Sequence, residues 1–78
     1  MFILKENSIL YRIFRLRLEA GFTQEELGKI LGMSRVMYNK LENGKTILHV
    51  HHVIILSIFY GVTSDYILGL SDIRSVTT

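Results

Sequence analysis

The 78-residue sequence contains no cysteine and no proline. Without cysteine, the chain can form neither a disulfide framework nor a thiolate metal site. Apolar residues make up 49% of the sequence, which excludes a disordered chain, because such chains combine few apolar residues with high net charge. The length allows one small domain, whose core must be sufficient by itself or be completed by a partner subunit.

Long hydrophobic runs and strong net charge are also lacking. The apolar stretch at 53–60 has only eight residues, with a serine inside, whereas a membrane span needs about 20. The first residues, MFILKENS, lack the basic start and cleavage site of a signal peptide. We therefore expect a cytoplasmic protein. A net charge of +2 permits nucleic-acid binding without requiring it.

Six glycines punctuate the sequence, and glycine is favoured just past the ends of helices. Between five of them, apolar residues recur with helical spacing, and no stretch alternates as a strand would. The pattern predicts an all-α chain with helices at about 7–20, 24–31, 35–43, 49–60 and 64–69, and a loose tail at 71–78. The expected inward-facing residues are Ile9, Ile13, Leu16, Leu27, Ile30, Leu31, Tyr38, Leu41, Val50, Val53, Ile54 and Ser57.

Hydroxyl residues precede three of these segments, where helix N-caps are expected. Thr23 is followed three residues later by Glu26, which is the capping-box pattern. Ser34 can cap the helix that begins at Arg35, and Thr63 or Ser64 can cap the last one.

Two short helices joined by a glycine-containing turn at 32–34 are typical of a helix-turn-helix over about 24–43. The whole stretch 16–45, LRLEAGFTQEELGKILGMSRVMYNKLENGK, resembles the lambda-repressor/Cro-type (XRE) family of bacterial and phage regulators. The resemblance extends over about 9–70. It implies a five-helix domain at 1–70, with an apolar extension at 1–6, that binds double-stranded DNA and needs no cofactor.

The third helix is expected to enter the major groove with its N-terminal end foremost. Arginine matches guanine, valine a thymine methyl and asparagine adenine. Asn39 and Lys40 are equally suited to contact phosphate or to form an ordinary polar surface. The expected base contacts are Arg35, Val36, Asn39 and Lys40. Helix starts and the turn at 43–45 offer amides to phosphate. The expected phosphate contacts are Thr23, Gln24, Ser34, Asn43 and Lys45.

Four further positions are expected to have structural roles. The resemblance implies that Arg17 pairs with Glu42 and ties the first helix to the third. Gly28 stands where the family usually has alanine, at a close helix crossing. Tyr38 is larger than the usual residue, and its hydroxyl must reach a partner or solvent.

Apolar residues occupy positions in the first and fourth helices where the family usually has charged residues. They are Tyr11, Phe14, Leu18, Ile55 and Ile58. Either the extension, with Phe2, Ile3 and Leu4, folds over this surface, or the surface is an interface. We favour a homodimer interface, and we assign Phe59 and Tyr60 to the monomer core.

The sequence offers little support for a metal site or for catalysis. His49 and His52 share a helix face that excludes His51, and no nearby acid or cysteine completes a metal site, so we expect no bound metal. The sequence has no phosphate-binding glycine loop and no nucleophile motif, which argues against an enzyme. We expect a DNA-binding repressor that reads a two-fold operator. The alternative is an antitoxin or other protein-interaction module that uses the apolar surface.

Overall fold

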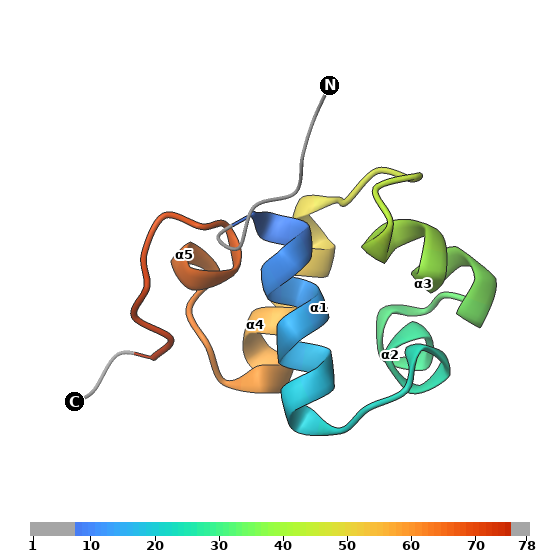
Figure 1. Ribbon diagram of the computed structural model, residues 1–78, viewed down its shortest axis with the longest axis horizontal. Helices are drawn as coiled ribbons and strands as arrows, with labels where there is room; N and C mark the ends of the chain where they lie inside the picture. Colours follow the sequence, from blue (N-terminus) through green and yellow to red (C-terminus); the bar gives the residue numbers. More distant parts are fainter. Residues whose placement is uncertain (1–7, 76–78) are drawn as a thin grey trace.

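The computed structural model describes residues 8–75 and contains, within them, five helices and no strand. The helices are α1 (Ile9–Ala20), α2 (Gln24–Leu31), α3 (Arg35–Glu42), α4 (Val50–Tyr60) and α5 (Ser64–Ile67) (Figure 1). Each helix agrees with its predicted range to within two residues, so the all-α prediction is confirmed. The apolar extension expected at 1–6 lies outside the described residues.

Side-chain caps start the helices and glycines end them. The Thr23 hydroxyl accepts a hydrogen bond from the Glu26 N–H at 3.1 Å, and the Glu26 carboxylate accepts one from the Thr23 N–H at 2.9 Å, which confirms the capping box. The Ser34 hydroxyl accepts a hydrogen bond from the Met37 N–H and so caps α3, and the Thr63 hydroxyl accepts one from the Tyr66 N–H and caps α5. α1, α2 and α4 each end at a glycine with positive φ, a conformation that suits glycine best.

α1 lies at the centre, with α2 and α3 on one side and α5 on the other (Figure 1). α2 and α3 pack closely on each other, and α1 contacts both α3 and α5. The core takes residues from all five helices: Ile13, Leu16, Leu27, Leu31, Tyr38, Leu41, Val53, Leu56, Tyr66 and Ile67. None of the described helices is long and apolar enough to cross a membrane.

The predicted inner face of α4 is wrong at two of its four positions. Val53 is buried, but Val50 is 76% and Ile54 is 51% exposed, and the inward positions belong instead to His52 and Leu56. Apolar residues surround almost the whole of α4, so the sequence carries no polar face from which the orientation of the helix could be read.

The same ambiguity explains why two of three neighbouring predictions are wrong. Ile55, which we placed on the outer surface, is partly buried against the core. Phe59, which we placed in the core, is 39% exposed and packs its ring against Phe22 at a centroid distance of 5.2 Å. Tyr60 does pack on the core, where its buried hydroxyl has no hydrogen-bond partner among the described residues.

The expectation of a loose tail from residue 71 is also wrong as far as residue 75. The Thr63 N–H donates to the Arg74 carbonyl at 2.6 Å, and its hydroxyl donates to the Ile73 carbonyl at 3.2 Å. Arg12 donates to the Ser71 carbonyl at 2.7 Å. The segment 71–75 has no helical periodicity, and no local pattern in it indicates these contacts.

Candidate nucleic-acid interface

The turn between α2 and α3 closes over Gly28. The Met33 N–H donates to the Gly28 carbonyl at 2.7 Å. A Cβ atom on Gly28 would lie 2.8 Å from the Met33 carbonyl oxygen and 3.2 Å from that of Ser34. The chain therefore needs glycine here, rather than the small residue in general that the family resemblance implied, and this close approach sets the position of α3 on α2.

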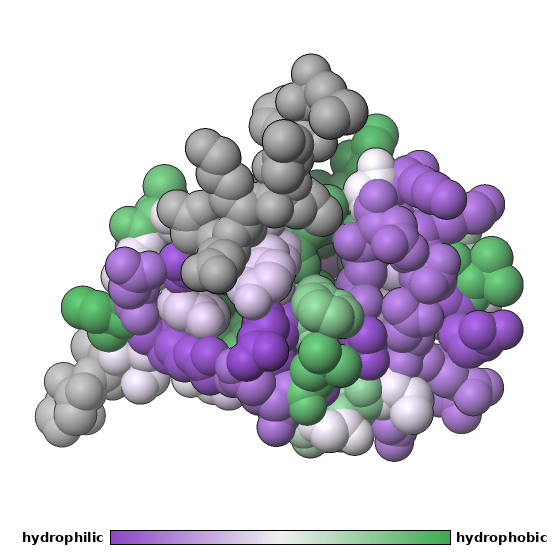
Figure 2. All heavy atoms as spheres, viewed as in Figure 1, coloured by the Kyte–Doolittle hydropathy of each residue, from purple (hydrophilic) through white to green (hydrophobic). Residues whose placement is uncertain are grey.

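α3 presents a polar face and buries the opposite one. Tyr38 and Leu41 are fully buried, as their spacing predicted. The four expected base-reading residues all lie exposed on α3: Arg35, Val36, Asn39 and Lys40. Figure 2 shows a largely hydrophilic surface over α2 and α3.

Met37 was missed by the sequence reasoning, although it is 41% exposed on α3. The sequence does indicate this role, because Met37 lies next to Val36 in the first turn of α3, the end of the helix that is expected to approach the bases.

Arg17 and Glu42 form an ion pair beneath this surface. Arg17 Nε lies 2.7 Å from Glu42 Oε2, and Nη2 lies 3.1 Å from Oε1. Their side chains are 11% and 5% exposed. The Tyr38 hydroxyl donates to Glu42 Oε2 at 2.7 Å, and Gln24 Nε2 donates to Oε1 at 3.2 Å. The pair therefore joins α1 to α3, and Gln24 joins both to the start of α2.

The surroundings of Glu42 determine its ionisation. Burial would by itself raise the pKa of Glu42, but the hydrogen bonds from Arg17, Tyr38 and Gln24 outweigh it, so the pKa lies below its ordinary value. The hydrogen bond with Glu42 raises the pKa of Arg17. Burial, and then the same carboxylate, raise the pKa of Tyr38. At neutral pH, this site thus holds a carboxylate, a guanidinium and a neutral phenol.

A chain of side-chain amides continues from this pair to the surface. Asn39 Nδ2 donates to Gln24 Oε1 at 3.1 Å, and Asn43 Nδ2 donates to Asn39 Oδ1 at 3.2 Å. From the sequence we expect each of these residues to contact DNA separately, whereas in the structure they bond to one another. Their amide groups are therefore oriented before any ligand arrives.

A family model described as helix-turn-helix matches residues 13–67. The chain belongs to the helix-turn-helix family of the lambda-repressor (XRE) type. This is a family of DNA-binding regulators that typically have no enzymatic activity. No curated protein and no solved structure is significantly similar to the chain.

In this helix-turn-helix domain, several groups expected at phosphates have partners within the protein. The Thr23 and Ser34 hydroxyls accept hydrogen bonds from the backbone of their own helices, which leaves each with a hydrogen to donate. The N–H groups of Asn43, Gly44 and Lys45 all bond to carbonyls of α3. The expectation that these amides hold a phosphate is therefore wrong, because closing the helix end uses them. The side chains of Asn43 and Lys45 remain exposed.

In this helix-turn-helix domain, the residues expected to form one apolar surface on the first and fourth helices lie on different sides. Tyr11 and Phe14 line a groove that they share with Gln24 and Asn39, so they face α2 and α3, although Tyr11 also borders the opposite side of α1. Leu18 is 46% exposed near the end of α1. Ile58 is 77% exposed on α4 and continues an apolar row that includes Val50 and Ile54. We call these three residues, Val50, Ile54 and Ile58, the α4 row.

The three histidines lie close together at the start of α4. Ring centroids are 4.1 Å apart between His51 and His52, 5.4 Å between His49 and His52, and 5.6 Å between His49 and His51. His52 Nδ1 accepts a hydrogen bond from the His49 N–H at 3.1 Å, and burial lowers the pKa of His52. No group of three potential ligands suited to a metal occurs in the described part of the chain. The buried histidine acts as a helix cap.

Proposed function

We propose that this protein is a sequence-specific transcriptional regulator that inserts α3 into the major groove of DNA and acts as a repressor. The observation that carries the proposal is the exposure of Arg35, Val36, Asn39 and Lys40 on a helix whose other side is locked in place. Tyr38 and Leu41 anchor that side in the core, and Glu42 anchors it to Arg17. Repression follows when the bound domain covers a promoter.

The side chains of α3 have distinct roles in this proposal. Arg35 pairs with guanine O6 and N7, and Val36 packs on a thymine methyl. Asn39 keeps one free N–H while its amide is held by Gln24, so it can donate to a base from a fixed orientation. Lys40 neutralises phosphate or reads a base edge.

Phosphate contacts position the domain on the DNA without reading its sequence. We assign them to exposed or half-buried side chains around α3. All of them except Asn43 have a donor that helix closure does not consume, and Asn43 Nδ2 must exchange one of its two bonds to Asn39 for a phosphate. These residues are Thr23, Gln24, Ser34, Asn43 and Lys45.

We also propose that the protein binds as a homodimer to a partly palindromic site, with half-sites about 34 Å apart. The α4 row is the better candidate interface, since Tyr11 and Phe14 face α2 and α3. Because the ligand is chromosomal or phage DNA, we place its action in the cytoplasm.

Selection from a random-sequence DNA pool at about 0.15 M salt tests this function, because specific contacts outlast the salt-sensitive general attraction. We expect an enriched two-fold motif, whose half-site spacing gives the dimer geometry. If the selection enriches no sequence, the protein does not bind DNA sequence-specifically. Sedimentation of the free protein tests the dimer separately, and a monomer at micromolar concentration would count against a self-interface.

The second candidate function is an antitoxin or other protein-interaction module. The observation that favours it is the α4 row itself, because exposed apolar residues in a continuous row often mark protein interfaces. In that case, substitution of Ile54 and Ile58 by serine would abolish partner binding and leave DNA binding intact.

A further inference from the structure

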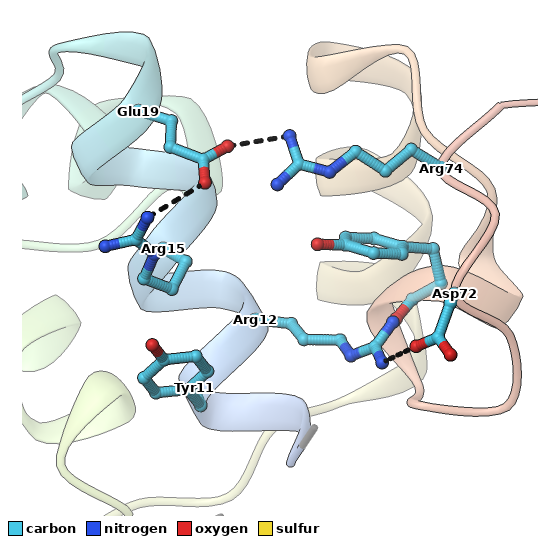
Figure 3. A pocket seen from close by; sticks show the side chains of 7 residues that line it. Tyr11, Arg12, Arg15, Glu19, Asp72 and Arg74 are labelled. Atoms are coloured by element: carbon cyan, nitrogen blue, oxygen red, sulfur yellow. Dashed lines mark hydrogen bonds and ion pairs between the residues drawn. The ribbon is translucent and has the colours of Figure 1, made fainter. Parts of the chain in front are cut away.

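A polar groove of about 310 Å³ lies between α1 and the segment 71–75 (Figure 3). It is lined by three arginines, two carboxylates and two tyrosines. The lining residues come from both ends of the described chain, at 11–19 and 66–74. Its lining residues belong to α1, α5 and the segment 71–75, and α5 lies on the other side of α1 from α3 (Figure 1). The groove has no part in the proposed DNA contacts.

Arg12 forms the floor of this groove. Its side chain is only 7% exposed, donates to the Tyr66 and Ser71 carbonyls at 2.9 and 2.7 Å, and lies over the Tyr66 ring at 4.4 Å. Its ion-pair partner is Asp72, at 2.7 Å, whose side chain is 96% exposed. A buried guanidinium needs a negative partner. Because Asp72 stands in solvent, another oxyanion can replace it without disturbing the core.

The rest of the groove has more donors than acceptors. Glu19 lies between Arg15, at 3.3 Å, and Arg74, at 2.7 Å (Figure 3). The hydrogen bond from Arg74 lowers the pKa of Glu19, so this carboxylate is charged at neutral pH. Three guanidiniums thus face two carboxylates and leave an excess positive charge. Each guanidinium has five N–H groups, and most of those in the groove are not used by these contacts.

We propose that this groove binds an oxyanion, the phosphate or carboxylate group of a small molecule, with Arg12, Arg15 and Arg74 as its ligands. Planar guanidiniums bind both groups with paired hydrogen bonds. The oxyanion takes the place of Asp72 on Arg12 and bridges Arg15 and Arg74. Occupancy links α1 to the segment 71–75 and leaves the polar face of α3 open.

The test is an NMR titration of the ¹⁵N-labelled full chain with inorganic phosphate and, in a second arm, with succinate, at constant pH and ionic strength. We expect the backbone and arginine Nε–H signals of Arg12, Arg15 and Arg74 to shift and saturate in the millimolar range. The arm that saturates first identifies the phosphate or the carboxylate as the preferred group. The signals of Arg35 report general attraction to α3, which does not saturate.

Substitutions at two positions, Arg15 and Glu19, distinguish a ligand site from a merely structural ion-pair cluster. Arg15→Gln weakens binding several-fold, and Arg15→Lys, which keeps the charge, restores part of it. Glu19→Gln strengthens binding several-fold, because it removes a negative charge from the groove. Glu25→Gln, at an exposed carboxylate on α2, is the matched control and leaves the affinity unchanged.

Three results would overturn the proposal. They are shifts confined to α3, no saturation by about 50 mM of either anion, and Glu19→Gln weakening the binding as a structural role requires. The amide spectrum of each variant reports whether it is folded, and Arg15 is exposed enough that its replacement leaves the core intact.

Discussion

α3 and α4 are held in place by different means. α3 is fixed by directional bonds, because Glu42 accepts from Arg17, Tyr38 and Gln24 under a polar outer face. α4 is fixed chiefly by the burial of Val53 and Leu56, and its outer face carries the α4 row. Directional bonds set the angle and rotation of a helix, which a base-reading surface requires. Burial is non-directional and leaves one apolar side available to a partner.

The largest expected effect comes from breaking the bonds that fix α3. Glu42→Ala leaves the Arg17 guanidinium buried without its partner, and removal of one member of a buried pair costs about 3–5 kcal/mol of unfolding free energy. Urea denaturation followed by circular dichroism measures this loss. The exposed Glu19, which pairs with Arg15 and Arg74, provides the control, since solvent screens these pairs and Glu19→Ala costs much less stability. Equal losses in both variants would mean that the buried pair has no special role in stability.

The second prediction concerns the orientation of α4. Leu56→Ala removes a fully buried side chain and lowers the unfolding free energy by about 2–5 kcal/mol. Ile54→Ala, on the exposed side of the same helix, changes the stability of the monomer by about 0.5 kcal/mol or less. Thermal denaturation of both variants at low protein concentration compares the two faces. If Ile54→Ala lowered the stability more than Leu56→Ala, the inner face of α4 would be the one that the sequence pattern predicts.

These two helices also show how far the sequence can predict the structure. In α3, polar Arg35, Asn39 and Lys40 alternate with Tyr38 and Leu41 at helical spacing, so the pattern defined both faces. In α4, the same reasoning selected Val50 and Ile54, because the single exposed polar residue, His51, does not define a polar face. Periodicity locates a face only where the two faces differ in polarity.

Other features depend on contacts that no local pattern records. The hydrogen bond of Asn39 to Gln24 joins residues 15 positions apart, and that of Arg12 to Ser71 spans 59. Glycine at position 28 looked like a tolerated small residue. The nearness of the Met33 carbonyl, which makes it necessary, depends on the path of the turn.

The third prediction tests that turn. Alanine is favoured over glycine inside a helix by about 1 kcal/mol, so helix propensity alone predicts that Gly28→Ala stabilises the protein. The new methyl group would lie 2.8 Å from the Met33 carbonyl oxygen, which forces the backbone to move. Such overpacking costs about 1–3 kcal/mol, and we expect a net loss of stability. Lys29→Ala, at the exposed neighbouring position, is the control. A rise in melting temperature for Gly28→Ala would show that the turn can relax.

The fourth prediction separates base contacts, which read the DNA sequence, from phosphate contacts, which only position the domain on the DNA. At the selected DNA site, Arg35→Ala costs about 1–3 kcal/mol of binding free energy and relaxes the preference at one base position. Lys45→Ala weakens binding to all sequences alike and lowers the salt dependence, because it removes a phosphate contact. Fluorescence anisotropy with matched and scrambled duplexes measures both. If Arg35→Ala weakened binding to matched and scrambled duplexes equally, Arg35 would not contact the bases.

The smallest expected effect lies in the amide chain that joins the fixed interior to the reading surface. Gln24 and Asn39 share a neutral, exposed hydrogen bond, so a double-mutant cycle with alanine gives a coupling of about 0.5 kcal/mol in folding. If this bond orients Asn39 for the bases, the same cycle measured on DNA affinity also shows coupling. Gln24→Ala then relaxes the base preference at the position that Asn39 reads. Coupling in folding without any in DNA affinity would mean that Gln24 supports the fold alone and that Asn39 turns freely to meet the DNA.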